Sequence, residues 1–391
     1  MNDFCLINKI GFDSLMIDYD MTEQEMIEAF EKMLVPIKEL YTEITTRGNQ
    51  FCYPFIYTDA DGDYLAYVTK LTKGFVDRVK KLDGVSVQIL NHAFDKLPAD
   101  KKPKKSFDFM RDVEALSELV IDVLENCYRC YPDDAFQKLK NFFEADDCYY
   151  LDMLPQLQVK KWTLYRIRKG SFDKTKDGEM FHIPFEKRHL VDSQRYSIPG
   201  YPILYLAGSF FTAWCEMDKP ELDGLNFAGF KFKNEELFVD LGYPFHSTSI
   251  WEWYSLFVMY PLLIACMVRV KNPSAPFKPE YIMPQLMTKL VREHGSRFTG
   301  IAYMSNKLPE SYRLNSISSR NLAVCTNNCI CIKGHDTDLA SRMLMKDIHT
   351  ITREELREVI KCENKFEIDF TKIEQFADSQ FREIKVEMIQ G

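Results

Sequence analysis

The hydrophobic period of the sequence changes near Leu154, and this change constrains the fold more than any other feature of the chain. Before it, apolar residues recur every three or four positions, as on the buried face of an amphipathic helix. After it, short β-branched and aromatic runs alternate with turns. The second part shows no regular βαβ alternation. We therefore expect an α+β chain, with a mainly α-helical N-terminal domain over residues 1–153 and a second domain over residues 154–391.

Two amphipathic helices are predicted in the N-terminal part. Thr22 precedes Glu25 at the spacing of a capping box. The second helix is expected from about Asp112 to Cys130. Between them, residues 95–106 hold two prolines and five lysines and are predicted to form an exposed loop. The first helical series consists of Met26, Ile27, Phe30, Met33, Leu34, Ile37, Leu40 and Tyr41.

Short strands are expected after Leu154. Ser209 is the predicted N-cap of a helix that carries Trp214, and residues 280–294 are predicted to form a helix that ends at Gly295. The tail after Thr350 is expected to be helical. The predicted strands are Trp162–Arg168, Ile203–Ala207, Phe238–Leu241, Gly300–Ser305 and Asn321–Thr326.

The acidic charge is confined to the N-terminal part. Residues 1–150 hold 18 Lys and Arg against 28 Asp and Glu, a net charge of −10, in a chain whose formal net charge is −8. A general nucleic-acid binder needs excess Lys and Arg to neutralise phosphates, so this balance argues against one. The second part is close to neutral and can accept an anionic small molecule without bulk repulsion.

No metal site is expected. The chain has 11 cysteines, which predict reduced and mostly buried thiols in a reducing cytosol. Cys127 and Cys130 have C-x-x-C spacing, but no second pair or His partner follows them. Asp59 to Asp63 has its glycine fourth and Lys70 at the twelfth position, which does not match a calcium-binding loop and favours a polar turn.

A cytoplasmic protein is expected. The N-terminal residues carry early acids and no apolar segment of a secretory signal. The longest apolar stretch, Trp251 to Val268, comes close to the length of a membrane span, but it contains Glu252 and Pro261. A buried helix that is kinked or broken at the proline explains it better.

Polar residues interrupt four apolar segments of the second part. These segments are Leu164-Tyr-Arg166, Gln194-Arg-Tyr-Ser-Ile-Pro-Gly200, Leu204-Tyr-Leu-Ala-Gly-Ser209 running into Trp214-Cys-Glu216, and Gly300-Ile-Ala-Tyr-Met-Ser305. No Gly-x-Gly-x-x-Gly turn and no Walker loop accompanies them.

Two arginines, a glutamate and a serine in these segments have a chemical use. The guanidinium groups of Arg166 and Arg195 can bind phosphate through two parallel hydrogen bonds. The carboxylate of Glu216 can stabilise a sugar cation as a glycosidic bond breaks. The hydroxyl of Ser305 can hydrogen-bond a ribose or an amide. On spacing alone, a structural ion pair between Arg166 and Glu216, with Ser305 as a strand end, is the better explanation, because such pairs are common.

Together, the four segments resemble the RES family, which is named for its Arg, Glu and Ser. Its members are bacterial toxins that degrade NAD and have an ADP-ribosyltransferase-like fold. The similarity runs from about Trp162 to about Ile332, and includes Tyr205, 11 residues before Glu216, and the helix Tyr281-Ile-Met-Pro-Gln-Leu. The second segment departs from the family pattern, because glycine-arginine-phenylalanine is usual where this chain has Gln194-Arg-Tyr. The resemblance implies an ADP-ribosyltransferase-like mixed β-sheet core with surrounding helices.

The resemblance also implies a site and a reaction. The family's arginine, glutamate and serine fall on Arg166, Glu216 and Ser305, which are the expected catalytic residues. NAD is the implied substrate, its nicotinamide–ribose bond is the bond that breaks, and no separate cofactor is expected. The residues expected to bind the substrate are Arg195, Tyr205, Tyr165, Tyr196 and Asn321.

Several choices stay open. The acceptor of the ADP-ribosyl group can be water, inorganic phosphate or a protein side chain. An ADP-ribosyltransferase acting on a protein or a nucleic acid, and a non-catalytic interaction scaffold, are the alternatives to an NAD-cleaving toxin or anti-phage effector. Small RES toxins are generally neutralised by an Xre-like antitoxin, so such a partner is one expectation. Regulation by the roughly 150 extra N-terminal residues is the alternative, and a homo-oligomer is also possible. Neither a nucleic-acid nor a membrane partner is expected.

Overall fold

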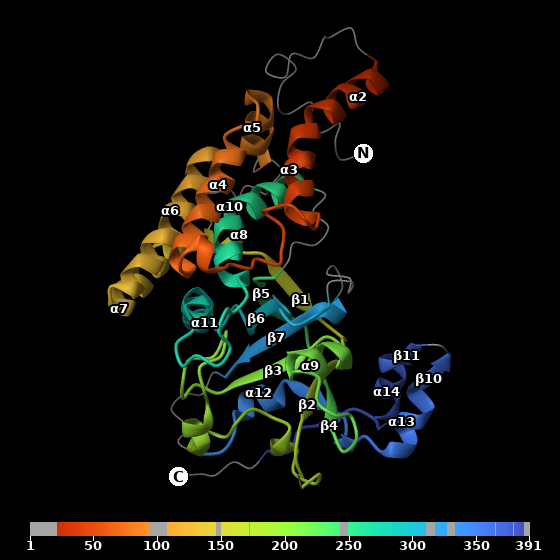
Figure 1. Cartoon of the computed structure of the whole chain (residues 1–391). Coiled ribbons are helices and arrows are strands. Elements are labelled where there is room, and N and C mark those ends of the chain that lie inside the picture. The colour runs from red at the N-terminus through yellow and green to blue at the C-terminus, as the bar shows by residue number, and fades with distance from the viewer. Residues whose placement is uncertain are drawn as a thin grey trace. The chain divides into compact units, whose positions relative to one another are not determined.

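The chain divides into two compact units (Figure 1). A computed structural model describes residues 22–93, 108–145, 150–171, 173–242, 249–309, 317–326, 333–363, 365–377 and 379–386. Unit 1 comprises residues 1–155 and 244–283, and unit 2 comprises residues 156–243 and 284–391. The sequence-based division assigned residues 244–283 to the second domain, whereas the structure places them in the helical unit. The loop expected at residues 95–106 falls outside the described residues.

Unit 1 is built from helices. The capping box at Thr22 is confirmed, since the Thr22 backbone N–H donates to the Glu25 carboxylate at 2.8 Å and the Thr22 side chain accepts from the Glu25 backbone. The apolar series that follows is shared by two helices, because Pro36 lies in the first turn of the second. The helices are α2 (Glu23–Met33), α3 (Val35–Thr45), α4 (Tyr64–Val79), α5 (Gly84–Asn91), α6 (Phe109–Tyr128), α7 (Pro132–Glu144), α8 (Tyr150–Met153) and α10 (Ile250–Met267).

Helix α10 supplies the core of unit 1. It buries 14 of its 18 residues. By length and composition it could cross a membrane, with a mean hydropathy of 1.4, but most of that stretch is buried inside the fold. The expected buried helix is confirmed, and of the two alternatives at Pro261 the break is wrong, because the helix continues through this residue. Tertiary packing of an apolar helix outweighs the single backbone hydrogen bond that a proline removes.

Polar contacts inside unit 1 join α10 to other helices. The buried carboxylate of Asp112 on α6 accepts hydrogen bonds from the hydroxyls of Tyr254 at 2.7 Å and Tyr150 at 3.0 Å. The hydroxyl of Tyr64 on α4 donates to the backbone oxygen of Ala265 at 2.8 Å. Because both partners in these contacts lie in unit 1, α10 belongs to the N-terminal helices in structure although it begins 97 residues after the last of them ends.

Unit 2 is a mixed β-sheet with helices, so the α+β class is confirmed. The strands follow the order β1-β5-β6-β7-β3-β2-β4-β8-β12, with β9 paired on β4. Among the described strands of this sheet, all pairs are antiparallel except β5 with β6. The strands are β1 (Gln156–Val159), β2 (Leu164–Arg168), β3 (Ile203–Ala207), β4 (Asn226–Phe232), β5 (Glu236–Asp240), β6 (Gly300–Met304), β7 (Arg320–Cys325), β8 (Met343–Met345), β9 (His349–Thr350) and β12 (Arg382–Glu383).

This sheet is almost divided in two. Strands β2 and β3 are paired only at Tyr165 and Ala207. One half-sheet therefore holds β1, β5, β6, β7 and β3, and the other holds β2, β4, β8, β9 and β12. A buried apolar cluster includes residues of both halves, such as Leu206, Phe230 and Leu322. The two halves thus share a core although only one residue pair joins their strands.

Helices accompany the sheet of unit 2. The tail after Thr350 is not purely helical as expected, since it also forms the hairpin of β10 (Ile360–Glu363) with β11 (Lys365–Ile368). In Figure 1 this hairpin lies beside α13 and α14. The helices are α9 (Phe210–Glu216), α11 (Ile282–Glu293, of which residues 284–293 belong to unit 2), α12 (Thr337–Ser341), α13 (Arg353–Val359) and α14 (Phe370–Phe376).

Candidate functional site

Helix α9 carries Glu216 at its C-terminal end. Ser209 is its N-cap, as predicted, and the Ser209 hydroxyl accepts from the backbone N–H of Thr212 at 3.1 Å. Gly208 precedes the cap because a Cβ there would lie 2.0 Å from the backbone oxygen of Ile317. The start of α9 therefore lies close against the chain that leads into β7. Because the helix is short, the position of its start determines the position of Glu216 at its end.

Residues from two neighbouring strands hold the carboxylate of Glu216. Asn321 on β7 donates from Nδ2 to Glu216 Oε1 at 2.8 Å. Ser305, which follows β6, hydrogen-bonds the same carboxylate through its hydroxyl. Both side chains are buried, Ser305 fully. Three residues that lie up to 105 positions apart in the sequence thus form one hydrogen-bonded group with a fixed carboxylate orientation.

Burial and the neighbouring charges set the pKa of Glu216 and strengthen the interaction of its carboxylate with a nearby cation. Burial raises its pKa, while the hydrogen bonds from Ser305 and Asn321 and the cations of Lys307 and Arg195 oppose that rise. Burial prevails, so the pKa lies above the usual range of a glutamate. A poorly solvated anion of this kind interacts more strongly with a developing positive charge than one in water does.

Tyr303 is a member of this cluster that sequence reasoning missed. It faces Asn321 across the β6–β7 pair. Its pKa is raised well above the usual value by burial first, and then by Glu216, Tyr205 and Tyr196. The ring of Tyr196 lies 4.6 Å from that of Tyr303. The signal was available, because the period of a strand places residue 303 on the same face as Ser305.

A loop held by α11 brings Arg195 to the same cluster. Gln285 donates from Nε2 to the hydroxyl of Ser193 at 3.0 Å and to the backbone oxygen of Gln194 at 2.9 Å. Thr288 donates to the backbone oxygen of Tyr196 at 3.2 Å. The positive charge of Arg195 then acts on both Glu216 and Tyr303.

Arg166 lies at the point where the two half-sheets part. Its Nη1 donates to the backbone oxygen of Tyr205 on β3 at 3.1 Å. Burial, together with the charge of Arg168, lowers its pKa to about 9. Its Nε is buried and has no hydrogen-bond partner among the described residues. A buried donor of this kind is costly unless a bound group accepts from it.

The structural ion pair between Arg166 and Glu216 is not present. Within the described chain, Arg166 bonds the Tyr205 backbone and Glu216 bonds Asn321 and Ser305. The reason is that the carboxylate of Glu216 is held by Asn321 on β7 and by Ser305 after β6, whereas Arg166 belongs to the other half-sheet. Explaining the two residues as a salt bridge was therefore wrong.

Tyr165 is the one expected site residue that the structure turns elsewhere. Its hydroxyl hydrogen-bonds Glu374 of α14, and burial and this carboxylate raise its pKa. Its ring belongs to an apolar cluster with Phe210 and Ala213 of α9. The structure thus gathers Glu216, Ser305, Asn321, Arg195, Tyr196 and Tyr205 with Tyr303, and joins Arg166 to them through Tyr205.

His182 is buried. Its Nε2 accepts from the backbone N–H of Asp336 at 2.8 Å, and its Nδ1 lies 2.8 Å from the backbone oxygen of Ile183. Burial lowers its pKa to about 4, so the ring is neutral and structural at pH 7. His189, in contrast, is exposed. No group of three or more His, Cys, Asp or Glu suited to a metal ion occurs among the described residues.

The comparisons with known proteins give one similarity. Over 170 residues, the chain is 34% identical to the protein named "Putative toxin YopC" of Bacillus subtilis (strain 168). The match covers 38% of this chain and 38% of that protein. No protein-family model matches the sequence, and no solved structure matches the fold. The chain is thus similar, over part of its length, to a protein named as a toxin.

Proposed function

We propose that unit 2 is an NAD-cleaving enzyme of the RES type, and that the chain acts in the bacterial cytoplasm as a toxin or anti-phage effector. The observation that carries the proposal is the carboxylate of Glu216, buried and held by Ser305 and Asn321. The resemblance of the surrounding segments supplies the substrate, and the similarity to YopC supports the toxic role. The ADP-ribosyltransferase-like fold is part of the same proposal.

The proposed reaction breaks the bond between the nicotinamide nitrogen and C1′ of its ribose. The bonding electron pair leaves with nicotinamide, and the sugar ring develops oxocarbenium character. The fixed negative charge of Glu216 stabilises this cation. An acceptor then adds to C1′: water gives ADP-ribose and releases a proton, whereas inorganic phosphate gives the 1-phosphate of ADP-ribose.

The remaining residues of the cluster suit the rest of a dinucleotide. Arg195 and Arg166 present guanidinium groups to its phosphates, and the unpartnered Nε of Arg166 is a donor for a phosphate oxygen. The rings of Tyr205, Tyr196 and Tyr303 offer flat surfaces for a base or nicotinamide. In this proposal the phosphates bind where the two half-sheets part, and the nicotinamide–ribose bond lies at Glu216.

A product analysis tests the proposal. Purified full-length protein is incubated with NAD, with and without phosphate, and the products are identified by mass. Free nicotinamide together with ADP-ribose or its 1-phosphate supports the proposal and identifies the acceptor. Label transferred from NAD to macromolecules of a cell extract, without free ADP-ribose, favours the transferase instead. Intact NAD after prolonged incubation contradicts both.

A neighbouring lysine should set the pH range of this activity. Lys307 donates to the backbone oxygen of Glu216 at 2.7 Å, and its charge lowers the pKa of that carboxyl. In Lys307→Met the pKa of Glu216 should therefore rise, so the loss of kcat/KM on acidification should begin at a higher pH than in the wild type. A pH profile of NAD cleavage measures the shift. Lys233→Met, at a lysine paired with Glu383, is the matched control and should leave the profile in place.

A further inference from the structure

The C-terminal helix α14 contacts the helix that carries Glu216. The carboxylate of Glu374 accepts from the backbone N–H of Phe210 at 2.8 Å, and Phe210 is the first residue of α9. This N–H has no partner inside the helix, as in every first turn. Glu374 therefore supplies the acceptor that α9 itself lacks at this position.

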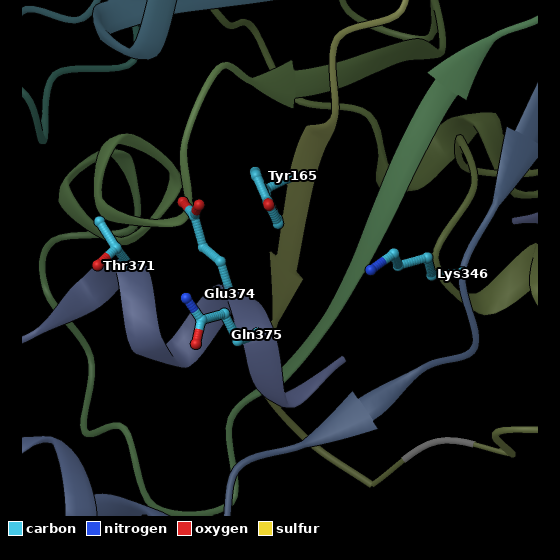
Figure 2. A pocket seen from close by; sticks show the side chains of 5 residues that line it. All are labelled: Tyr165, Lys346, Thr371, Glu374 and Gln375. Atoms are coloured by element: carbon cyan, nitrogen blue, oxygen red, sulfur yellow. The ribbon is translucent and has the colours of Figure 1, made fainter. Parts of the chain in front are cut away.

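A second residue orients this carboxylate. The hydroxyl of Tyr165 on β2 hydrogen-bonds Glu374, and burial of the group raises the pKa of Glu374 against the effect of these bonds. Figure 2 shows Tyr165 beside Glu374, with Gln375 and Thr371 on the same helix and Lys346 opposite. These five residues line a cavity of about 540 Å³. Because this side of Glu374 is hollow, hydrogen bonds rather than close packing fix the carboxylate.

Aromatic side chains also pack between α14 and α9. The ring of Phe370 on α14 lies 4.8 Å from that of Phe211 and 5.0 Å from that of Trp214, both on α9. Helix α9 has only seven residues, so a change at its start is carried to Glu216 within two turns. The far end of the chain thus holds the start of the helix whose last residue is Glu216.

We infer that Glu374 is a positioning residue for Glu216, and that Tyr165 serves the site by orienting Glu374 rather than by binding substrate. The inference rests on the proposed function for its effect on NAD cleavage, but the contact itself can be tested without substrate. It gives Tyr165, which the site does not use, a defined role.

The test compares Glu374→Ala with three other variants. Glu374→Gln keeps a side-chain oxygen that can accept from Phe210, and Tyr165→Phe removes only the orienting hydroxyl. Gln375→Ala alters the neighbouring cavity residue, which makes no hydrogen bond to α9 among the described residues. In Glu374→Ala we expect faster hydrogen exchange of the Phe210 amide, which loses its acceptor, and a shift of the Asn321 side-chain amide signals in a spectrum of protein labelled at asparagine. Glu374→Gln and Gln375→Ala should resemble the wild type, with Tyr165→Phe intermediate.

The kinetic result should follow the same order. Glu374→Ala should lower kcat by on the order of 10- to 100-fold, since a displacement near 1 Å at a reacting group has this effect. KM should change little, and Glu374→Gln should restore most of kcat. If Glu374→Ala does not fold, Tyr165→Phe gives the same readouts.

The outcomes separate this inference from the proposed function. Unchanged exchange at Phe210 and unchanged Asn321 signals in Glu374→Ala overturn the inference whether or not NAD is cleaved. A shift of the Asn321 signals with an unchanged kcat also overturns it, while the NAD activity stands. If the wild type cleaves no NAD, the proposed function fails, and the Asn321 signals still decide whether Glu374 positions Glu216.

Discussion

Glu216→Gln should lose NAD cleavage by on the order of a hundredfold or more, because a fixed charge facing a developing cation in a water-poor site is worth about 3 kcal/mol. Glutamine keeps the oxygen that accepts from Asn321, and so keeps the shape of the site. Burial already disfavours the charge of Glu216, so its neutral replacement should not lower the melting temperature by more than a few degrees. Initial rates of nicotinamide release and a thermal melt measure both effects.

Two comparisons make this result specific. Glu235→Gln alters an exposed glutamate in the same unit and should cleave NAD at the wild-type rate. Arg166→Ala should lose NAD binding as well as turnover, since it removes a phosphate donor, whereas Glu216→Gln should still bind NAD. In cells, the wild type should deplete NAD and arrest growth, and Glu216→Gln should do neither. Wild-type turnover by Glu216→Gln would remove that residue from the reaction.

A chain that begins at residue 156 should fail to fold as a soluble monomer. It keeps α10 but loses α3, α4 and α6, which belong with α10 to unit 1. The 14 buried residues of α10 would face water, and each large apolar side chain contributes about 1.5–3 kcal/mol when fully buried. Together these exceed the roughly 5–15 kcal/mol by which folded proteins are stable. Light scattering and ultracentrifugation of the fragment should show aggregates.

A second fragment is the control for this prediction. It joins residues 156–243 to residues 284–391 through a flexible glycine-serine linker, and so removes α10 together with the N-terminal helices. Because unit 2 has apolar cores of its own, this fragment should be soluble and melt cooperatively. A monomeric, cooperatively melting chain of residues 156–391 would show that α10 does not depend on the N-terminal helices.

The local elements of this fold could be predicted from the sequence, and the long-range ones could not. The apolar run between Pro202 and Gly208 predicted the bounds of β3, and Ser209 predicted the start of α9, since both signals lie within a few residues. Strand β4 was not predicted, because six of its seven residues are buried and its sequence shows no alternation to detect. The membership of α10 in unit 1 was not predicted, because the sequence of an apolar helix does not indicate which helices pack against it.

The same distinction applies to the site. Glu216, Ser305 and Asn321 could be found by resemblance and do form one hydrogen-bonded group. Tyr165 could not be placed, because its partner Glu374 lies more than 200 residues further along the chain and no local pattern joins them. The position of Arg166 depends on where the sheet splits, which is a property of strand pairing in three dimensions.

The discontinuity of unit 1 also orders events during synthesis. A ribosome makes α2 to α8 first, then β1 to β5, and only afterwards the helix that fills the core of the first group. N-terminal regions usually fold first as they emerge, but here their core stays open until residue 267 has been translated. The contact between α9 and Glu374 forms later still, because Glu374 is translated 158 residues after Glu216. The two ends of α9 are therefore completed at different times, Glu216 by Ser305 and Asn321 and Phe210 by the later α14.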